Sequence, residues 1–396
     1  MKQSLLLWVC LLTGTALLGQ NPRLHPDARI SIITCGPHQG ELYSAFGHSA
    51  IRVFDPSLGI DLAYNYGVFD FDQPNFYLNF ARGYSYYKLA VYPYPLFRDH
   101  YISYNRYVHE QVLNLTEAQK QKVFDFLEWN ALPENASYLY DYFYDNCATR
   151  VRDVFFNAMK EELVFDSTFI QSKYSIRQLT DLYLSHQPWG DLGIDICLGL
   201  PMDKTAAAYE YMFLPDYIEW SFDHVSIKTD STWHPIVKEK INVYEARPTS
   251  VPTSWVHPWL AMSALLILVA VVSYFDWRRG RPARWLDGLL FGTTGAIGLL
   301  LALLWTATNH QAAAQNFNLL WALPTHLVVV FFYLRSASWV PGYFKAVSVV
   351  YGLLLVSWWL LPQQLHFFLL PLVAALLMRC VLLGWVLQPK TAAKGK

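Results

Sequence analysis

The second half of the chain consists of long apolar segments separated by short polar connections. Five such segments lie near residues 257–275, 286–306, 319–335, 343–361 and 365–387. Each is close to the roughly 20 residues that a helix needs to cross a bilayer. The pattern therefore predicts an all-α bundle of about five transmembrane helices.

The basic residues between the apolar segments predict the direction of this bundle. They follow the first span, the third span and the last span: Arg278, Arg279, Arg281, Arg284, Arg335, Lys345, Lys390, Lys394 and Lys396. The two other connections, around 310–318 and 362–366, contain neither Lys nor Arg. Because cytoplasmic loops carry an excess of these residues, we expect a cytoplasmic C-terminus and an N-terminal domain outside the cytoplasm.

The first 20 residues have the pattern of a cleavable export signal. Lys2 precedes an apolar run that ends at Leu12, and small residues follow up to Gly19. A retained anchor helix is the alternative, although the apolar run is short for one. We therefore divide the chain into a signal peptide, an exported domain, a transmembrane domain and a cytoplasmic tail: 1–20, 21–250, 251–389 and 390–396.

Strands are predicted near the start of the exported segment. The runs 30–34, 49–54 and 60–66 are rich in β-branched and aromatic residues, and turn residues occupy 55–59. Short runs of this composition, separated by such a turn, predict a β-hairpin between the last two strands.

Helices are predicted further along the exported segment. Thr116 and Gln119 have the spacing of a capping box, which opens an amphipathic helix. A second helix is expected to begin at Asn146, and 171–220 has the pattern of several helical pieces before late strands at 225–244. The exported domain is therefore expected to be α+β.

Composition agrees with a membrane protein and argues against one class of partner. Hydrophobic residues make up 54% of the 396 residues and charged residues 15%, against roughly 25% charged in a soluble domain. The formal net charge is −1, so the chain lacks the basic surplus with which proteins neutralise nucleic-acid phosphates. We expect a membrane as partner and no nucleic acid.

One cysteine of the exported segment lies where a thiol becomes reactive. Cys147 follows Asn146 at the predicted start of a helix, and Arg150 and Arg152 come shortly after. Unpaired backbone N–H groups, the helix dipole and positive charge all stabilise a thiolate. An isolated cysteine is more often a small buried residue without a catalytic role. A general base close to Cys147 would favour the catalytic interpretation. His48, at the start of a predicted strand, is the candidate general base.

A third polar group has to fix the tautomer of the base. If Phe54 pairs with Ile60 across the predicted turn, His48 lies opposite Tyr66. Asn65 would then point to the other face of the sheet unless a bulge intervenes. Three candidates for the orienting residue therefore remain open: Tyr66, Tyr64 and Asn65.

Two further cysteines remain in the exported segment. Cys35 precedes a Gly-Pro turn, and without a helix start it is a lesser candidate for the nucleophile. In an oxidising compartment we expect a disulfide between Cys35 and Cys197 instead. The histidines of the exported segment show no metal-ligand spacing, so no metal site is expected.

A few other polar residues are candidates for substrate contacts. Arg82 is suited to bind a phosphate or a carboxylate, although an arginine between Ala and Gly is as often a solvated surface residue. His310, Asn316 and Asn318 lie in an outer connection and are candidates to line a lipid site, although such a loop is polar simply because it is wet.

Several segments carry a resemblance to a known family. They are Cys35-Gly36-Pro37, Ser44-Ala45-Phe46-Gly47-His48-Ser49-Ala50-Ile51-Arg52, Tyr64-Asn65-Tyr66-Gly67, Phe80-Ala81-Arg82-Gly83, Asp145-Asn146-Cys147-Ala148-Thr149-Arg150 and Asn316-Phe317-Asn318-Leu319-Leu320-Trp321. In these segments the chain resembles the Lnb-type bacterial lipoprotein N-acyltransferases. The order of a strand with His, a further strand and a helix with Cys also resembles the circularly permuted papain-like fold of NlpC/P60-type peptidases and of lecithin:retinol acyltransferase.

The resemblance implies an activity and a cellular location. The family moves an acyl chain from a phospholipid to the α-amine of the diacylglyceryl-modified N-terminal cysteine of a lipoprotein. The chain would be a multi-pass protein of the bacterial inner membrane with its catalytic domain in the periplasm, and its partners would be a phospholipid donor and a diacylated lipoprotein acceptor.

At the site, we expect Cys147 to attack the donor ester and form a thioester, while His48 takes up and returns protons. No cofactor is expected. Substrate contacts are expected from six residues: Arg82, Asn146, Arg150, His310, Asn316 and Asn318. Two alternatives remain: a membrane-anchored cysteine hydrolase acting on peptidoglycan peptides or acyl esters with the same pair, and a non-catalytic envelope sensor.

Overall fold

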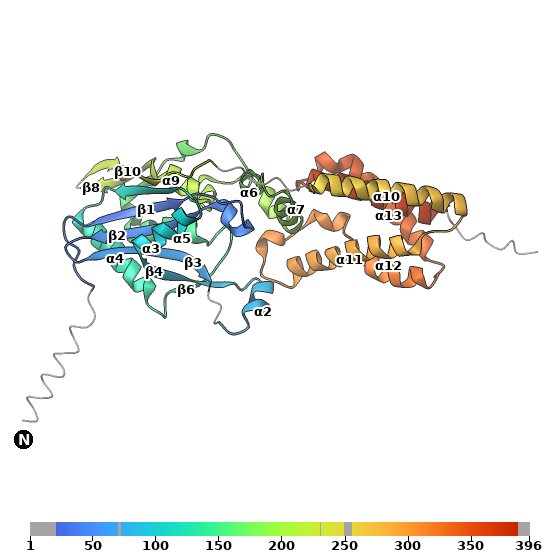
Figure 1. The fold of residues 1–396 in the computed structure, drawn as a ribbon, viewed down its shortest axis with the longest axis horizontal. Helices are drawn as coiled ribbons and strands as arrows, with labels where there is room; N and C mark the ends of the chain where they lie inside the picture. Colours follow the sequence, from blue (N-terminus) through green and yellow to red (C-terminus); the bar gives the residue numbers. More distant parts are fainter. Residues whose placement is uncertain (1–20, 70–72, 230, 249–255, 387–396) are drawn as a thin grey trace, which may run out of the picture.

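The computed structural model describes residues 21–69, 73–229, 231–248 and 256–386. The molecule is elongated, with a mixed α/β domain at one end and a bundle of helices at the other (Figure 1). The predicted signal peptide, the predicted boundary near residue 250 and the C-terminal tail lie outside the described residues.

A seven-stranded antiparallel sheet forms the centre of the α/β domain. Its strand order is β10-β5-β1-β2-β3-β4-β6, and every neighbouring pair is antiparallel. The predicted strands and the predicted hairpin of β2 and β3 are confirmed. The strands are β1 (Arg29–Cys35), β2 (His48–Asp55), β3 (Ile60–Phe69), β4 (Tyr86–Pro93), β5 (Val108–Leu113), β6 (Ser137–Leu139) and β10 (Val237–Tyr244).

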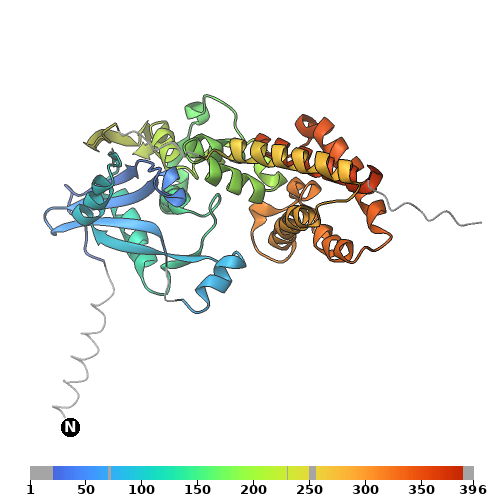
Figure 2. The same ribbon diagram turned by 45° about the vertical axis from the view of Figure 1, so that its right-hand side comes forward.

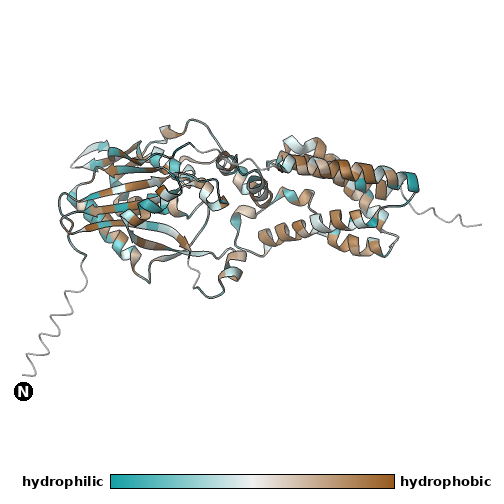
Figure 3. Ribbon diagram, in the orientation of Figure 1, coloured by the Kyte–Doolittle hydropathy of each residue, from teal (hydrophilic) through white to brown (hydrophobic). Residues whose placement is uncertain are grey.

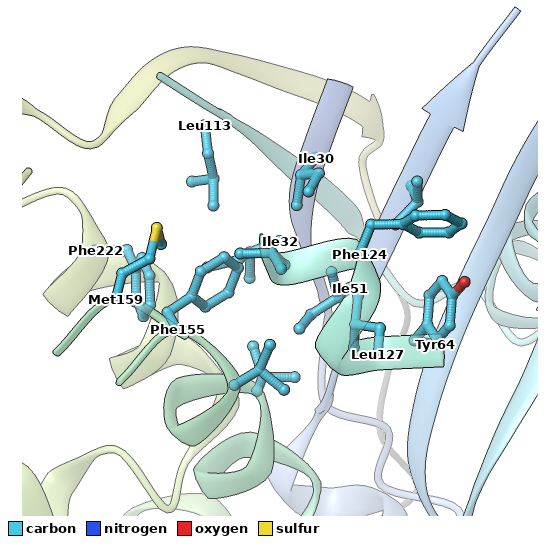
Figure 4. Packing of buried hydrophobic residues seen from close by; sticks show 14 of the residues in the cluster. Ile30, Ile32, Ile51, Tyr64, Leu113, Phe124, Leu127, Phe155, Met159 and Phe222 are labelled. Carbon is cyan, nitrogen blue, oxygen red and sulfur yellow. The ribbon is translucent and has the colours of Figure 1, made fainter. Parts of the chain in front are cut away.

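Helices cover both faces of this sheet. The first two lie on one face and the third on the other: α4 (Glu117–Ala131), α5 (Cys147–Met159) and α3 (Tyr94–Ser103). Ile32, Ile51 and Phe155 belong to the apolar core between the sheet and the first pair (Figure 4). Ile33 and Ala50 belong to a smaller cluster under α3. The central strand β1 is accordingly buried on both faces from Ile30 to Cys35.

The chain between the two halves adds a small sheet and short helices beside the main sheet. The helical pieces predicted at 171–220 and the late strands predicted at 225–244 are confirmed. These elements are β7 (Leu163–Phe165), α6 (Ile176–Leu184), α7 (Pro188–Cys197), α8 (Ala208–Tyr211), α9 (Pro215–Phe222), β8 (Val225–Thr229) and β9 (Thr232–Pro235).

Five segments of the second half are long and apolar enough to cross a membrane, as predicted, with mean hydropathies between 1.5 and 2.3. In Figure 3 the ribbon of these helices is mostly brown, the colour of hydrophobic residues. Their main helices are α10 (Pro258–Arg279), α11 (Arg284–Thr306), α12 (Thr325–Leu334), α13 (Val340–Ser357) and α14 (Leu370–Val381).

A buried arginine joins three of the spans. Arg379 of α14 donates hydrogen bonds to Asp276 and Ser273 of α10 at 2.9 and 3.0 Å, and to Asp287 of α11 at 2.7 Å. Inside a membrane such charges are retained only when they are paired, so this cluster fixes how α10, α11 and α14 pack.

The outer loops of the bundle are fastened to backbone carbonyls at the end of α7. Asn316 donates to the Ile196 carbonyl at 2.8 Å, Asn318 donates to the same carbonyl at 3.2 Å, and Gln363 donates to the Leu198 carbonyl at 2.9 Å. All three amide side chains are buried. The two halves of the molecule are therefore joined by buried hydrogen bonds as well as by the connecting chain, and they lie end to end in both views (Figures 1 and 2).

A glycine makes this junction possible. The Gly199 N–H donates to the Ala312 carbonyl at 2.7 Å, and a Cβ on Gly199 would lie 1.8 Å from the Ala314 carbonyl oxygen. Any larger residue would push the loop of the bundle away from the α/β domain.

Candidate active site

Cys147 is the first residue of α5, and the preceding residue caps the helix. The Asn146 side-chain oxygen accepts hydrogen bonds from the Ala148 and Thr149 N–H groups at 2.9 and 3.0 Å. The Thr149 hydroxyl accepts one from the Asn146 N–H at 2.7 Å. The Asn146 amide group donates to two backbone carbonyls of neighbouring loops. Asn146 is therefore fully engaged in holding the start of α5, rather than turned toward a substrate.

His48 opens β2 and is oriented by Asn65 of β3. Its Nε2 lies 2.6 Å from the Asn65 side-chain oxygen. Because that oxygen only accepts hydrogen bonds, Nε2 carries a proton and Nδ1 is left for a second partner. The imidazole stacks on the Tyr101 ring at 5.7 Å between centroids, with an interplanar angle of 14°. The stacking on Tyr101 thus fixes the plane of the His48 ring, and the hydrogen bond to Asn65 fixes the position of Nε2.

The register of β2 and β3 explains why Asn65 is the orienting residue. Ile60 pairs with Asp55 and not with Phe54, so the predicted register is wrong by one residue. A slip of one residue turns every side chain of a strand to the opposite face of the sheet. Asn65 therefore shares a face with His48, without any bulge being needed between the two strands.

The two tyrosines beside Asn65 have other partners. The Tyr64 hydroxyl donates to Glu128 of α4, and the Tyr66 hydroxyl donates to the Asn130 side-chain oxygen at 2.7 Å. Both rings are buried in the core between the sheet and α4. They stabilise the packing of α4 on the sheet, and neither is hydrogen-bonded to His48.

Cys147 enters the sheet where β2 and β3 cease to pair. Their ladder stops at the pair of Ile51 and Tyr64, and the backbone N–H groups of Ser49 and Ala148 act to lower the pKa of Cys147. Gly67 of β3 has φ +84°, and a Cβ there would lie 3.4 Å from the Cys147 Cβ. A glycine allows β3 to turn beside the thiol in this left-handed conformation.

The electrostatics of the pair favour a charged thiolate and imidazolium. Burial opposes ionisation of Cys147, but the charge of His48, its hydrogen bond and the backbone hydrogen bonds hold the pKa of Cys147 below its ordinary value. Burial would likewise lower the pKa of His48, yet the charge of Cys147 and the hydrogen bonds with Cys147 and Asn65 raise it overall. The site thus has the properties of an activated nucleophile with its base.

The cations near the site are not those that the sequence suggested. Arg150 is paired with Asp145, and Arg152 is paired with Asp153 at 2.7 Å. Their positive charges are therefore largely neutralised beside the helix start, and Arg150 faces a carboxylate within the protein.

Arg106 is a buried cation on the other side of the base, and no sequence pattern marked it. Its Nε donates to the Gly36 carbonyl at 2.5 Å, and its guanidinium lies 4.7 Å from the centroid of the Tyr101 ring that stacks on His48. Its charge acts to lower the pKa of His48, which opposes the effect of the thiolate.

The expected disulfide between Cys35 and Cys197 is wrong. Both are free thiols; Cys35 lies in the cluster under α3, whereas Cys197 packs against the membrane bundle. Cys35 pairs with His48 across β1 and β2, but burial raises the pKa of its thiol far above the ordinary value. Cys147, and not Cys35, has the environment of a reactive thiol.

Two family models match the chain. The model described as the Lnb N-terminal periplasmic domain matches residues 25–181, and the model described as the Lnb transmembrane domain matches residues 250–391. Together they cover the strands and helix that carry His48, Asn65 and Cys147 as well as all five spans. The chain belongs to the Lnb family. No curated protein and no solved structure matches it.

Family membership confirms the resemblance seen in the sequence and fixes the coarse description of the molecule. This Lnb protein is a membrane-bound, lipoprotein-processing enzyme of the inner membrane, with a mixed α/β periplasmic domain followed by about five apolar helices. Within the part of the chain that is described, no cluster of three or more His, Cys, Asp or Glu side chains is arranged to hold a metal ion.

The remaining candidate residues of this Lnb protein fall into two places. Arg82 and His310 meet at the outer end of the membrane bundle, where the Asn309 N–H donates to the Arg82 carbonyl at 2.8 Å. Asn316 and Asn318 lie in the buried junction with α7. Their amides are engaged with backbone carbonyls, so they fasten the two halves of the protein together.

The coupling between His48 and Cys147 predicts a pH dependence for the Lnb thiol. With His48→Ala, the charge that lowers the pKa of Cys147 is gone, so this pKa should rise. Each rise of one in pKa lowers the thiolate fraction at neutral pH about tenfold. We expect alkylation of Cys147 by iodoacetamide, followed by mass spectrometry from pH 5 to 10, to shift its midpoint to higher pH and to slow at pH 7.

Asn65→Leu is the matched variant for this measurement. It removes the hydrogen bond that favours the charged imidazole, so its midpoint should lie between those of the wild type and His48→Ala. A pH profile that is the same in all three proteins would show that His48 does not act on Cys147.

Proposed function

We propose that this Lnb protein is a lipoprotein N-acyltransferase that works through an acyl-thioester on Cys147. The acyl donor is a phospholipid, and the acceptor is the α-amine of the diacylglyceryl-modified N-terminal cysteine of a lipoprotein. One observation carries the proposal: His48 is hydrogen-bonded to Asn65 at 2.6 Å and interacts with Cys147 at the start of α5, in a domain that is fastened to five membrane spans.

In the first half-reaction, the Cys147 thiolate attacks an ester carbonyl of the phospholipid. The bond between the carbonyl carbon and the glycerol oxygen breaks, and this oxygen takes the proton of the His48 imidazolium. A lysophospholipid leaves and the acyl group stays on Cys147 as a thioester.

In the second half-reaction, the lipoprotein amine attacks the thioester. His48 takes a proton from the amine nitrogen, the bond between carbon and sulfur breaks, and the thiolate is restored together with the imidazolium. The product is an amide. The protons and charges of the site thus return to their starting state after each cycle.

Both tetrahedral intermediates need N–H donors for their oxyanion. The cap of α5 uses the N–H groups of Ala148 and Thr149. The Cys147 N–H at the positive end of α5 is therefore the donor of this turn that we assign to the oxyanion. It needs no particular side chain, because a backbone group supplies it.

We further propose a circularly permuted papain-like fold for the periplasmic domain. The order of His48 on β2, Asn65 on β3 and Cys147 at the start of α5 supports it. The same triad would also serve a membrane-anchored cysteine hydrolase, so the fate of the thioester has to separate the two activities.

The orientation of the bundle follows from the same proposal. The chain should place the loop at Gln311 in the periplasm and Lys396 in the cytoplasm, because the basic connections alternate with connections that lack Lys and Arg. An alkaline phosphatase reporter should be active when inserted near Gln311 and inactive when fused after Lys396. The opposite pattern would reverse the bundle and move Cys147 to the cytoplasm.

The decisive experiment follows the acyl group with purified protein in phospholipid vesicles. Without an acceptor, we expect a hydroxylamine-sensitive acyl group on Cys147 and slow release of fatty acid. A diacylated lipopeptide with a free N-terminal amine should discharge this group as an amide and leave lysophospholipid. Holding the amine in attack geometry while water is kept out is worth roughly 7 to 11 kcal/mol of barrier, so transfer should outrun hydrolysis.

The same lipopeptide with an acetylated N-terminus is the matched control and should not discharge the thioester. Rapid release of fatty acid that is insensitive to the lipopeptide, or cleavage of peptidoglycan peptides, would assign the protein to the hydrolases instead.

A further inference from the structure

The short helix α2 (Phe76–Ala81) exposes a cluster of large apolar side chains beside the active-site domain. Tyr77 is 84% exposed, Leu78 56% and Phe80 41%, and the six residues of the helix include no charge. Exposed apolar groups that gather in this way mark contact surfaces on soluble domains or on membranes. We call Tyr77, Leu78 and Phe80 the α2 surface.

The position of α2 specifies what it meets. The residue after α2, Arg82, accepts a hydrogen bond from the Asn309 N–H at 2.8 Å through its carbonyl. A Cβ on Gly83 would lie 2.9 Å from the Asn309 carbonyl carbon, so the two backbones are in direct contact. Asn309 follows the outer end of α11, which stops at Thr306. Helix α2 therefore lies near the end of α11, as both ribbon views show (Figures 1 and 2). This is the level at which we place the outer surface of the membrane.

A series of aromatic rings leads from α2 to the thiol. Phe76 contacts Phe69 with ring centroids 6.4 Å apart, Phe69 contacts Tyr87 at 4.4 Å, and Tyr87 stacks on Tyr140 at 4.0 Å. The Tyr140 ring lies 3.6 Å from the position of a Cβ on Gly67. The same position is 3.4 Å from the Cys147 Cβ. A continuous series of aromatic side chains thus connects α2 with Cys147.

We propose that the α2 surface inserts into the outer leaflet and that Phe76, Phe69, Tyr87 and Tyr140 guide a phospholipid acyl chain from the bilayer to Cys147. Aromatic side chains are favoured at the headgroup level, where an amphipathic ring lies between water and hydrocarbon. The occupant is a phospholipid of the outer leaflet, because the chain contact at Asn309 holds α2 against the end of a span. The guidance of an acyl chain to Cys147 rests on the proposed function, whereas the membrane insertion of α2 does not.

Insertion can be measured without catalysis. Leu78→Cys and, as a control, Leu58→Cys are labelled with bimane in full-length protein that carries Cys147→Ser, and both proteins are reconstituted in phosphatidylcholine and phosphatidylglycerol vesicles. Leu58 is 44% exposed and lies in the turn after β2, at the opposite end of this strand from His48. Lipids with a nitroxide near the headgroup should quench the label at position 78 severalfold and leave that at position 58 almost unchanged. Equal, weak quenching at both positions would overturn the insertion.

Guidance of the acyl chain needs a second measurement. In the double variant Tyr77→Glu and Leu78→Glu, acylation of Cys147 from vesicle phospholipid should fall at least about tenfold, because each glutamate opposes insertion into hydrocarbon. Reaction of Cys147 with iodoacetamide should stay at the wild-type rate, since that reagent arrives from water. Leu58→Glu is the control and should change neither rate.

The outcomes separate this inference from the proposed activity. Quenching at position 78, together with failure of the protein that retains Cys147 to form an acyl-enzyme, would leave the membrane contact standing and remove the acyltransferase. Normal acylation from vesicles by the double variant would remove the guiding role of α2 and leave the acyltransferase standing. A double variant that also loses the iodoacetamide reaction is replaced by Tyr77→Ser and Leu78→Ser, which should show the same selective loss.

Discussion

Replacing Cys147 by serine should abolish formation of the acyl-enzyme while leaving the protein folded and inserted in the membrane. A serine hydroxyl at this position is not ionised near neutral pH, so it cannot replace the thiolate as nucleophile. Loss of the nucleophile of a working catalytic unit typically lowers the rate by several orders of magnitude, on the order of 10⁴-fold or more. We expect amide formation on the lipopeptide, followed by mass spectrometry, to fall below detection.

Cys35→Ala is the matched control for this substitution. It removes the thiol that is next to His48 in the sheet register but is kept neutral by burial, so amide formation should persist. Retained activity in Cys147→Ser together with loss in Cys35→Ala would transfer the nucleophile to Cys35. Retained amide formation in both variants would show that neither thiol is the nucleophile.

Replacing Arg177 by methionine should destabilise the periplasmic domain more than other single substitutions of a charged residue outside the membrane. Arg177 is fully buried; it bonds Asp195 at 2.8 Å and Asp203 at 3.0 Å. It also donates to the Leu198 carbonyl at 3.0 Å, next to the junction. Removing one partner of a buried ion pair leaves the other charge uncompensated and costs about 3 to 5 kcal/mol.

This loss corresponds to a fall in Tm of roughly 6 to 20 °C for a domain of this size, measured by thermal unfolding in detergent micelles. Arg98→Met is the control, because its ion pair with Asp99 is exposed and exposed pairs of this kind contribute little to stability. Equal Tm values for the two variants would contradict the role of Arg177. Adding Asp195→Asn and Asp203→Asn to Arg177→Met should restore part of the loss.

The sequence was sufficient to mark Cys147 and His48 as the candidate nucleophile and base, because their signals are local. Asn146 before Cys147 is a helix cap that can be recognised from a few neighbouring residues, and the spans follow from apolar length alone. The orienting residue depended on a register that turn residues do not determine to within one position. Since a single step exchanges the faces of a strand, Asn65 became evident only from the pairing of Ile60 with Asp55.

Other features could not be predicted from the sequence, because the residues that contact each other are distant in the chain. Arg106 lies near His48 because both residues contact the Tyr101 ring of α3, and no sequence motif marks it. Asn316 and Asn318 were candidates for a lipid site because they lie in an outer connection between spans, but a carbonyl about 120 residues earlier accepts their hydrogen bonds. Polarity along the sequence marked these residues correctly, but it did not reveal whether water, lipid or protein is their partner.

The junction between the two halves has a consequence for how Lnb sequences can diverge. Asn316 and Gln363 recognise peptide carbonyls of Ile196 and Leu198, and a carbonyl is the same whatever side chain the residue carries. The side chains at positions 196 and 198 can therefore change within the limits of packing, without compensating substitutions in the loops that carry Asn316 and Gln363. Covariation between aligned positions should therefore not detect this contact. An invariant glycine at position 199 should be the sequence feature that reveals it.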